Sequence, residues 1–170
     1  MQKILKVYFD YICPYCYRGI MNLLELLADY PGLSVEWIPC EAHPRPEQAF
    51  IHSDLAGQAM YSIEEQGGNL IQFHKEIFIA HFIDHRRIDS PSVLAHIAAA
   101  CGADRNTTLM AITDGVYRQS ILNNNQLVWD TLGFEAVPCY QSGNRLLTSH
   151  EDVMISRKQL KDFLDSVMVD

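Results

Sequence analysis

The first forty residues contain a strand, a helix and a second strand in close succession, and this order leaves few topologies open. Residues 3–9 are rich in β-branched and aromatic side chains, as expected of a strand buried on both faces. Apolar residues at helical spacing follow from Pro14 to about Tyr30, and residues 33–39 form the next predicted strand. Two strands joined through a helix must be parallel, with a right-handed crossover. We therefore predict a βαβ unit at the start of the chain.

The pattern then changes to helical periodicity alone, which extends from about Glu47 to Asn123. Ser90 and Asp104 are of the residue types that cap helix N-termini, and Pro91 suits the first helical position. The predicted helices cover 47–66, 69–85, 90–100 and 104–119, with a further short helix over 124–132.

Strands return after Gly133. Residues 135–141 and 145–150 are apolar runs around a Ser-Gly-Asn turn, which predicts an antiparallel hairpin. The last predicted helix runs from Ser156 to about Met168 and opens on a Ser-x-x-Gln capping box. The chain thus ends in a ββα module.

The predicted fold class is α/β. Residues 1–46 and 123–170 would form one domain around a shared sheet, and residues 47–122 would be an all-helical insertion covering one side of it. A chain of 170 residues with 48% hydrophobic residues is long enough to bury such a core.

The net charge and the hydropathy of the chain limit the kinds of partner that it can bind. The net charge of −8 is spread along the chain, so binding to nucleic acid or to anionic membranes is disfavoured. No run approaches the ~20 apolar residues that cross a bilayer. The short apolar run at the N-terminus is followed by no small-residue cleavage site, and we expect a cytoplasmic protein.

Two of the five cysteines, Cys13 and Cys16, stand three residues apart at the junction of the first strand and helix. At a helix N-terminus, unpaired N–H groups and the helix dipole stabilise a thiolate, which is the reactive form of cysteine. Pro14 suits the first helical turn, and Cys16 lies one turn on, on the same face as Cys13. In this interpretation Cys13 attacks a disulfide, and Cys16 resolves the resulting mixed disulfide.

Two other interpretations of the pair stay open. A structural zinc site needs four ligands, but no second cysteine pair exists, and His81 and His85 lie in the helical block. The two cysteines could also be core residues that are close by chance, although their position between strand and helix favours thiol chemistry. We therefore predict no metal site.

The stretch FDYICPYCYRG, residues 9–19, resembles the active-site region of the DsbA-like thioredoxin superfamily, and is most similar to its FrnE-like branch. Residues 132–140, LGFEAVPCY, resemble the segment that opens the second half of the thioredoxin fold. The resemblance implies a thioredoxin fold with a helical insertion over essentially the whole chain.

The resemblance also implies roles for individual residues. Cys13 would be the attacking and Cys16 the resolving cysteine. Pro138 would be a cis-proline facing the pair, and the backbone of Val137 would contact bound substrate. Pro14 and Tyr15 would help to shape the substrate surface.

Two positions depart from the family pattern. The acid that thioredoxin and DsbA carry six residues before the first cysteine is Val7 here, and Asp10 is present instead. Asp10 either relays protons for Cys16 or caps the start of the helix. Cys139, directly after Pro138, is either a third thiol or a small buried residue.

The function implied is that of a thiol–disulfide oxidoreductase acting on a thiol- or disulfide-containing protein or small molecule. It would bind no cofactor, its redox group being the dithiol itself, and either glutathione as a co-substrate or another thiol system would recycle it. A homodimer is compatible with the sequence. The alternatives are a glutathione-dependent enzyme of the kappa-transferase or hydroxychromene-carboxylate isomerase type, which shares the fold but carries an SPYSY-like motif, and a non-catalytic binding module.

Overall fold

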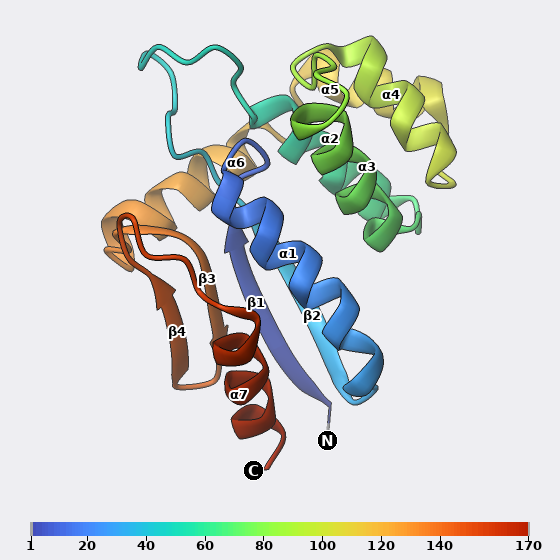
Figure 1. Ribbon diagram of the computed structural model, residues 1–170. Coiled ribbons are helices and arrows are strands. Elements are labelled where there is room, and N and C mark those ends of the chain that lie inside the picture. The colour runs from blue at the N-terminus through green and yellow to red at the C-terminus, as the bar shows by residue number, and fades with distance from the viewer. Residues whose placement is uncertain (1, 170) are drawn as a thin grey trace.

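The strands of both modules pair in a single four-stranded sheet with the order β2-β1-β3-β4 (Figure 1). The structure is a computed structural model and describes residues 2–169. β1 is parallel to β2 and antiparallel to β3, and β4 is antiparallel to β3. The strands are β1 (Lys3–Phe9), β2 (Leu33–Pro39), β3 (Ala136–Ser142) and β4 (Arg145–Ser149). The predicted parallel pair and the predicted hairpin are both confirmed.

One face of the sheet is covered by α1 (Pro14–Leu26) and α7 (Arg157–Met168), which contact each other (Figure 1). A short 3-10 turn, Leu27–Asp29, follows α1, so that helix ends earlier than predicted. The capping box of Ser156 and Gln159 at the start of α7 is confirmed.

Every regular element between β2 and β3 is helical, as predicted. The helices are α2 (Asp54–Glu65), α3 (Leu70–Phe82), α4 (Pro91–Ala100), α5 (Arg105–Asp114) and α6 (Arg118–Asn125), with a π-helix at Gln126–Thr131. Helices α2 to α5 gather near the end of the sheet where α1 begins (Figure 1). Tyr17 of α1 stacks on Phe82 of α3, with ring centroids 5.0 Å apart, and so joins the helical block to the sheet module.

Several predicted helix boundaries in this block are wrong, among them the end of the helix predicted over 69–85, which lies at Phe82. The first helix starts at Asp54 instead of Glu47, because Ile51 is the one buried side chain between Glu47 and His52, and a helix there would have no face to pack. The helix predicted over 104–119 ends at Asp114, where Gly115 takes a left-handed conformation (φ 67°). The helix predicted over 124–132 is the π-helix, continuous with α6.

A buried histidine lies behind the segment that leads into α1. His74 of α3 is fully buried, and its Nδ1 is 3.0 Å from the hydroxyl oxygen of Tyr11. The rings of Phe9 and Trp37 surround it. Burial lowers the pKa of His74 to about 3, so the imidazole is neutral in the folded protein.

The packing of α1 on β3 depends on a glycine. A Cβ atom added at Gly19 would lie 2.9 Å from Cγ of Pro138 and 2.7 Å from the hydroxyl oxygen of Tyr140. Any side chain at position 19 would therefore push α1 away from the segment that faces the cysteine pair.

Candidate active site

Cys13 is the last residue before α1 and the N-cap of that helix. Its carbonyl oxygen accepts the first intrahelical hydrogen bond, from the Tyr17 amide at 3.0 Å. Pro14 follows at the first helical position, as predicted. The Cys13 side chain is half-buried, so its sulfur is accessible from one side.

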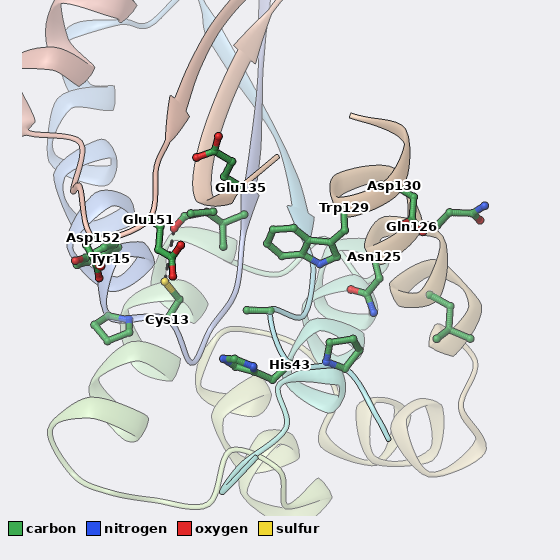
Figure 2. Close-up of a pocket in the computed structure, with 16 residues that line it drawn as sticks. Cys13, Tyr15, His43, Asn125, Gln126, Trp129, Asp130, Glu135, Glu151 and Asp152 are labelled. Atoms are coloured by element: carbon green, nitrogen blue, oxygen red, sulfur yellow. Dashed lines mark hydrogen bonds between the residues drawn. The ribbon is translucent and has the colours of Figure 1, made fainter. Parts of the chain in front are cut away.

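The second half of the chain forms a wall beside this sulfur. Sγ of Cys13 lies 3.6 Å from the carbonyl oxygen of Val137, the contact drawn as a dashed line in Figure 2. The peptide bond between Val137 and Pro138 is cis. The structure thus brings together the two segments that the sequence singled out, residues 9–19 and 132–140.

Cys16 differs from Cys13 in its surroundings. It is fully buried, and its sulfur accepts a hydrogen bond of 3.3 Å from the amide of Asp10. Burial raises the pKa of Cys16 well above that of a free thiol, and its hydrogen bond to Cys13 acts in the same direction. That same hydrogen bond is the main cause that lowers the pKa of Cys13, against the opposing effect of burial. Cys13 is therefore the thiol more easily ionised, and Cys16 holds its proton.

Asp10, whose amide contacts the Cys16 sulfur, is fully buried. Its carboxylate accepts hydrogen bonds from the amides of Ile12, at 3.1 Å, and Ala42, at 2.8 Å. Burial raises its pKa above the usual value, although both hydrogen bonds oppose this. The prediction that Asp10 caps the helix is wrong, because the carboxylate bonds ahead of α1 and the N-cap is Cys13.

Cys139 is fully buried in β3. Its thiol donates a hydrogen bond of 3.1 Å to the carbonyl oxygen of Ala136. Burial raises its pKa to about 11, so the thiol is protonated near neutral pH. This environment resembles that of a core cysteine.

A pocket of about 1060 Å³ opens beside the Cys13 sulfur. Pro14, Tyr15 and Val137 line it, together with residues of three segments that the sequence did not single out. Those segments are the loop after β2, the end of α6 with the π-helix, and the residues after β4: Ala42, His43, Pro44, Leu122, Asn125, Gln126, Trp129, Asp130, Glu151 and Asp152. Figure 2 shows Trp129 across the pocket from Cys13.

The far wall of the pocket is fixed by a polar cluster. The indole N–H of Trp129 donates a hydrogen bond of 2.8 Å to the carbonyl oxygen of Glu41. Asn125 bonds Glu41 twice, accepting from its amide at 2.7 Å and donating to its carboxylate at 2.9 Å. These contacts join residues 84 or more positions apart, which is why no local sequence signal announced them.

No group of three or more His, Cys, Asp or Glu side chains in residues 2–169 is arranged to hold a metal ion. Over the same residues, no helix combines the length and apolarity needed to cross a membrane.

Comparison with known proteins identifies the architecture. A model of the DSBA-like thioredoxin domain family matches residues 4–161 of this chain. The chain is 20% identical to the uncharacterized protein YwbO of Bacillus subtilis (strain 168) in an alignment 193 residues long. This alignment covers 93% of the present chain and 96% of YwbO.

Solved structures show the same fold. A cytosolic disulfide reductase, DsbM of Pseudomonas aeruginosa, whose structure was solved with GSH, superposes with a TM-score of 0.77 at 18% identity, over 98% of this chain and 100% of that chain. A putative protein disulfide isomerase from Nitrosomonas europaea superposes with a TM-score of 0.76 at 15% identity, over 98% and 97% of the two chains. The prediction of an α/β fold of the DsbA-like thioredoxin type is confirmed.

Proposed function

The chain belongs to the DSBA-like thioredoxin domain family, a family of thiol–disulfide oxidoreductases, and on this premise we propose that it exchanges thiols and disulfides through Cys13 and Cys16. The observation that carries the proposal is the contrast between the two thiols. Cys13 is accessible in the wall of a large pocket and has a lowered pKa, whereas Cys16 is buried behind it with a raised pKa.

The proposed reaction has two steps. The Cys13 thiolate attacks one sulfur of a substrate disulfide, forms a mixed disulfide with it, and releases the other substrate sulfur as a thiolate. Cys16 then gives up its proton and attacks Sγ of Cys13, which releases the second substrate thiol and leaves a Cys13–Cys16 disulfide. The substrate gains two electrons and the protein loses two. Two further thiol molecules restore the dithiol: the first opens the Cys13–Cys16 disulfide and forms a mixed disulfide on Cys13, and the second attacks that mixed disulfide, frees Cys13 and leaves joined to the first as a disulfide. Glutathione is the candidate thiol that the family resemblance suggests.

Neighbouring residues support these steps. We propose that the backbone of Val137, beside the cis peptide bond, pairs with the bound substrate, and that Pro14 and Tyr15 form the adjacent contact surface. We propose that Asp10, whose amide bonds the Cys16 sulfur and whose buried carboxyl acts electrostatically on Cys16, accepts the Cys16 proton in the second step, a role that its raised pKa suits. Cys139 takes no part, because its thiol is buried, protonated and bonded to Ala136.

Trapping the intermediate tests the proposal. The Cys16→Ser variant, mixed with a small disulfide such as hydroxyethyl disulfide, is expected to hold half of the disulfide on Cys13, as seen by intact-mass and peptide mass spectrometry. Wild-type protein is expected to end as the internal disulfide instead, and Cys13→Ser to form neither product. Cys101→Ser, which removes a buried thiol at the end of α4, serves as the control and should behave as wild type.

The same variant separates this function from glutathione-transferase chemistry. A transferase has no use for a second cysteine at position 16. Full turnover of a glutathione-dependent substrate by Cys16→Ser would therefore overturn the proposal. Failure of both thiols to react with an alkylating reagent would favour a binding module instead.

A further inference from the structure

The pocket beside Cys13 is strongly acidic. Four of the residues that line it are Asp or Glu: Asp130, Glu135, Glu151 and Asp152. No lysine or arginine lines it, and its one basic residue, His43, bonds Glu47 at 2.7 Å. The rim of the proposed reaction site therefore has one sign of charge.

These carboxylates are largely uncompensated. Asp130, Glu151 and Asp152 are exposed and make no ion pair with another described residue. Glu135 pairs with His150, at 3.2 Å. The acids come from the π-helix, from the segment before β3 and from the segment after β4, so they stand on different sides of the cavity (Figure 2). Charges on the rim act on a charged group that enters the pocket over about one Debye length, ~8–10 Å.

An aromatic ring adds to the preference for positive charge. Trp129 stands across the pocket from Cys13 in Figure 2, and its hydrogen bond to the backbone of Glu41 fixes the ring. A tryptophan face attracts ammonium and guanidinium groups. The cavity thus combines a nucleophilic sulfur, a fixed aromatic surface and a negative rim.

We propose, on the basis of the function proposed above, that this site selects disulfides that carry a positive charge next to their sulfur atoms. In a peptide, that charge is a lysine or arginine beside the cysteine; in a small molecule, it is an amine. Anionic disulfides, oxidised glutathione included, react more slowly, because the carboxylates repel them from the pocket.

The step in which selection operates is the first one. The reduced protein, with Cys13 as thiolate, meets the disulfide, forms the mixed disulfide and releases one substrate thiolate. Cys16 then completes the transfer of two electrons to the substrate. A single turnover therefore needs no further reductant, and its second-order rate reports the encounter directly.

The test measures that rate by stopped flow at low ionic strength for two charge-matched pairs of disulfides. Cystamine and dithiodipropionate form the small-molecule pair. Disulfides of the same short peptide, with lysine or with glutamate on both sides of the cysteine, form the peptide pair. Each rate is divided by the rate of the same disulfide with 2-mercaptoethanol, which removes differences in intrinsic reactivity. We expect the cationic member to be favoured about tenfold or more in at least one pair, equivalent to about 1.4 kcal/mol, and the pair with the larger ratio identifies the source of the substrate.

A charge-matched variant ties the preference to the pocket. In Asp130→Asn/Glu151→Gln/Asp152→Asn, the ratio of the cationic to the anionic rate is expected to fall to within about threefold. In the wild type, 0.5 M salt should lower the ratio to about the same level, because salt screens the charges of the pocket. Asp29→Asn/Asp84→Asn/Asp114→Asn removes the same number of exposed carboxylates away from the pocket and should keep the wild-type ratio.

The outcomes separate this inference from the function on which it rests. Neutral hydroxyethyl disulfide should react with wild-type protein and with the control variant Asp29→Asn/Asp84→Asn/Asp114→Asn at similar rates; no reaction in either of them would overturn the oxidoreductase proposal itself. A normal reaction with the neutral disulfide, combined with no cationic preference in either pair or with equal loss of preference in both triple variants, would overturn the substrate proposal alone.

Discussion

Sγ of Cys13 lies 3.6 Å from the carbonyl oxygen of Val137, although 124 positions separate the two residues in the chain. The contact arises because β1 and β3 are antiparallel neighbours in the sheet. The C-terminal end of β1 and the N-terminal end of β3 therefore lie side by side at the same end of the sheet. In the proposed function, a substrate bound at the Cys13 sulfur would therefore also contact the backbone of the second half of the chain.

Cys16 is expected to control the acidity of Cys13. The Cys16→Ala variant removes the hydrogen bond that is the main cause of the lowered pKa of Cys13, so that pKa should rise. The pH dependence of Cys13 alkylation, followed with iodoacetamide and mass spectrometry, measures the change, and the rate at pH 7 should fall several-fold. Cys101→Ala should leave the profile unchanged. A profile for Cys16→Ala that matches the wild type would show that the ionisation of Cys13 has another origin.

Asp10 is expected to speed the second step rather than the first. Asp10→Asn keeps the shape of the side chain but cannot accept a proton from Cys16, so the mixed disulfide should persist at least about tenfold longer, a conservative share of the ~10²–10⁴ that general bases contribute. Double-mixing stopped flow separates the two steps, and the pH dependence of the second should flatten.

The control for this experiment is another buried acid. Glu41→Gln removes a carboxylate that is bonded to Asn125 on the far side of the pocket, and it should resolve the mixed disulfide as fast as the wild type. Equal rates for Asp10→Asn and wild type would leave Asp10 a purely structural role.

The buried, neutral His74 is expected to make the free energy of unfolding fall in mild acid. Its pKa is about 3 in the folded protein against 6.5 as the ordinary value, so below pH 6.5 the unfolded chain binds a proton that the folded protein does not. Stability therefore falls as the pH drops from about 6.5 towards 3, by about 2 kcal/mol at pH 5 from this one group. The raised pKa of Asp10 acts in the opposite sense, because folded Asp10 takes up protons more readily than the unfolded chain.

Urea unfolding at pH 7 and pH 5 isolates the histidine. The loss of unfolding free energy between these two pH values should shrink in His74→Gln and persist in His96→Gln, which changes an exposed histidine of α4. The prediction fails if His74→Gln loses as much stability on acidification as the wild type does.

Adding a Cβ atom at position 19 is expected to lower the free energy of unfolding. In Gly19→Ala the added atom meets the ring of Pro138 and the hydroxyl of Tyr140, both buried, so the gain in helix propensity is outweighed by overpacking of about 1–3 kcal/mol. Gly32→Ala is the control, because its Cβ meets only the end of the flexible Met168 side chain at 3.4 Å. Urea unfolding should show a clear loss for the first variant and a change within about 0.5 kcal/mol for the second. Equal stabilities would mean that α1 can shift on β3 at no cost.

Local signals in the sequence predicted most of the elements correctly. β1 and β2 have the predicted limits, since buried parallel strands are continuous apolar runs bounded by turn residues. The helix at Pro91 begins at its cap, Ser90, as predicted. The missed break at Gly115 was visible in principle, because a glycine just past a helical run is a common stop signal.

The cysteine end of the site was predictable, whereas its far wall was not. The strand-to-helix junction placed Cys13 at a helix N-terminus from neighbouring residues alone. Trp129 and Asn125 reach the pocket through hydrogen bonds to Glu41, from a helix whose place is set by tertiary packing. Such contacts leave no periodicity in the chain, and so the pocket and its charge emerged only with the fold.

The separation of Cys13 from Val137 by the whole helical block also bears on biosynthesis. A ribosome releases β1, α1 and the cysteine pair long before it makes β3, the strand that begins with Ala136 and Val137. A nascent chain would therefore carry the proposed nucleophile before it carries the backbone wall beside it, and until translation nears completion the sulfur of Cys13 would lack its contact with Val137.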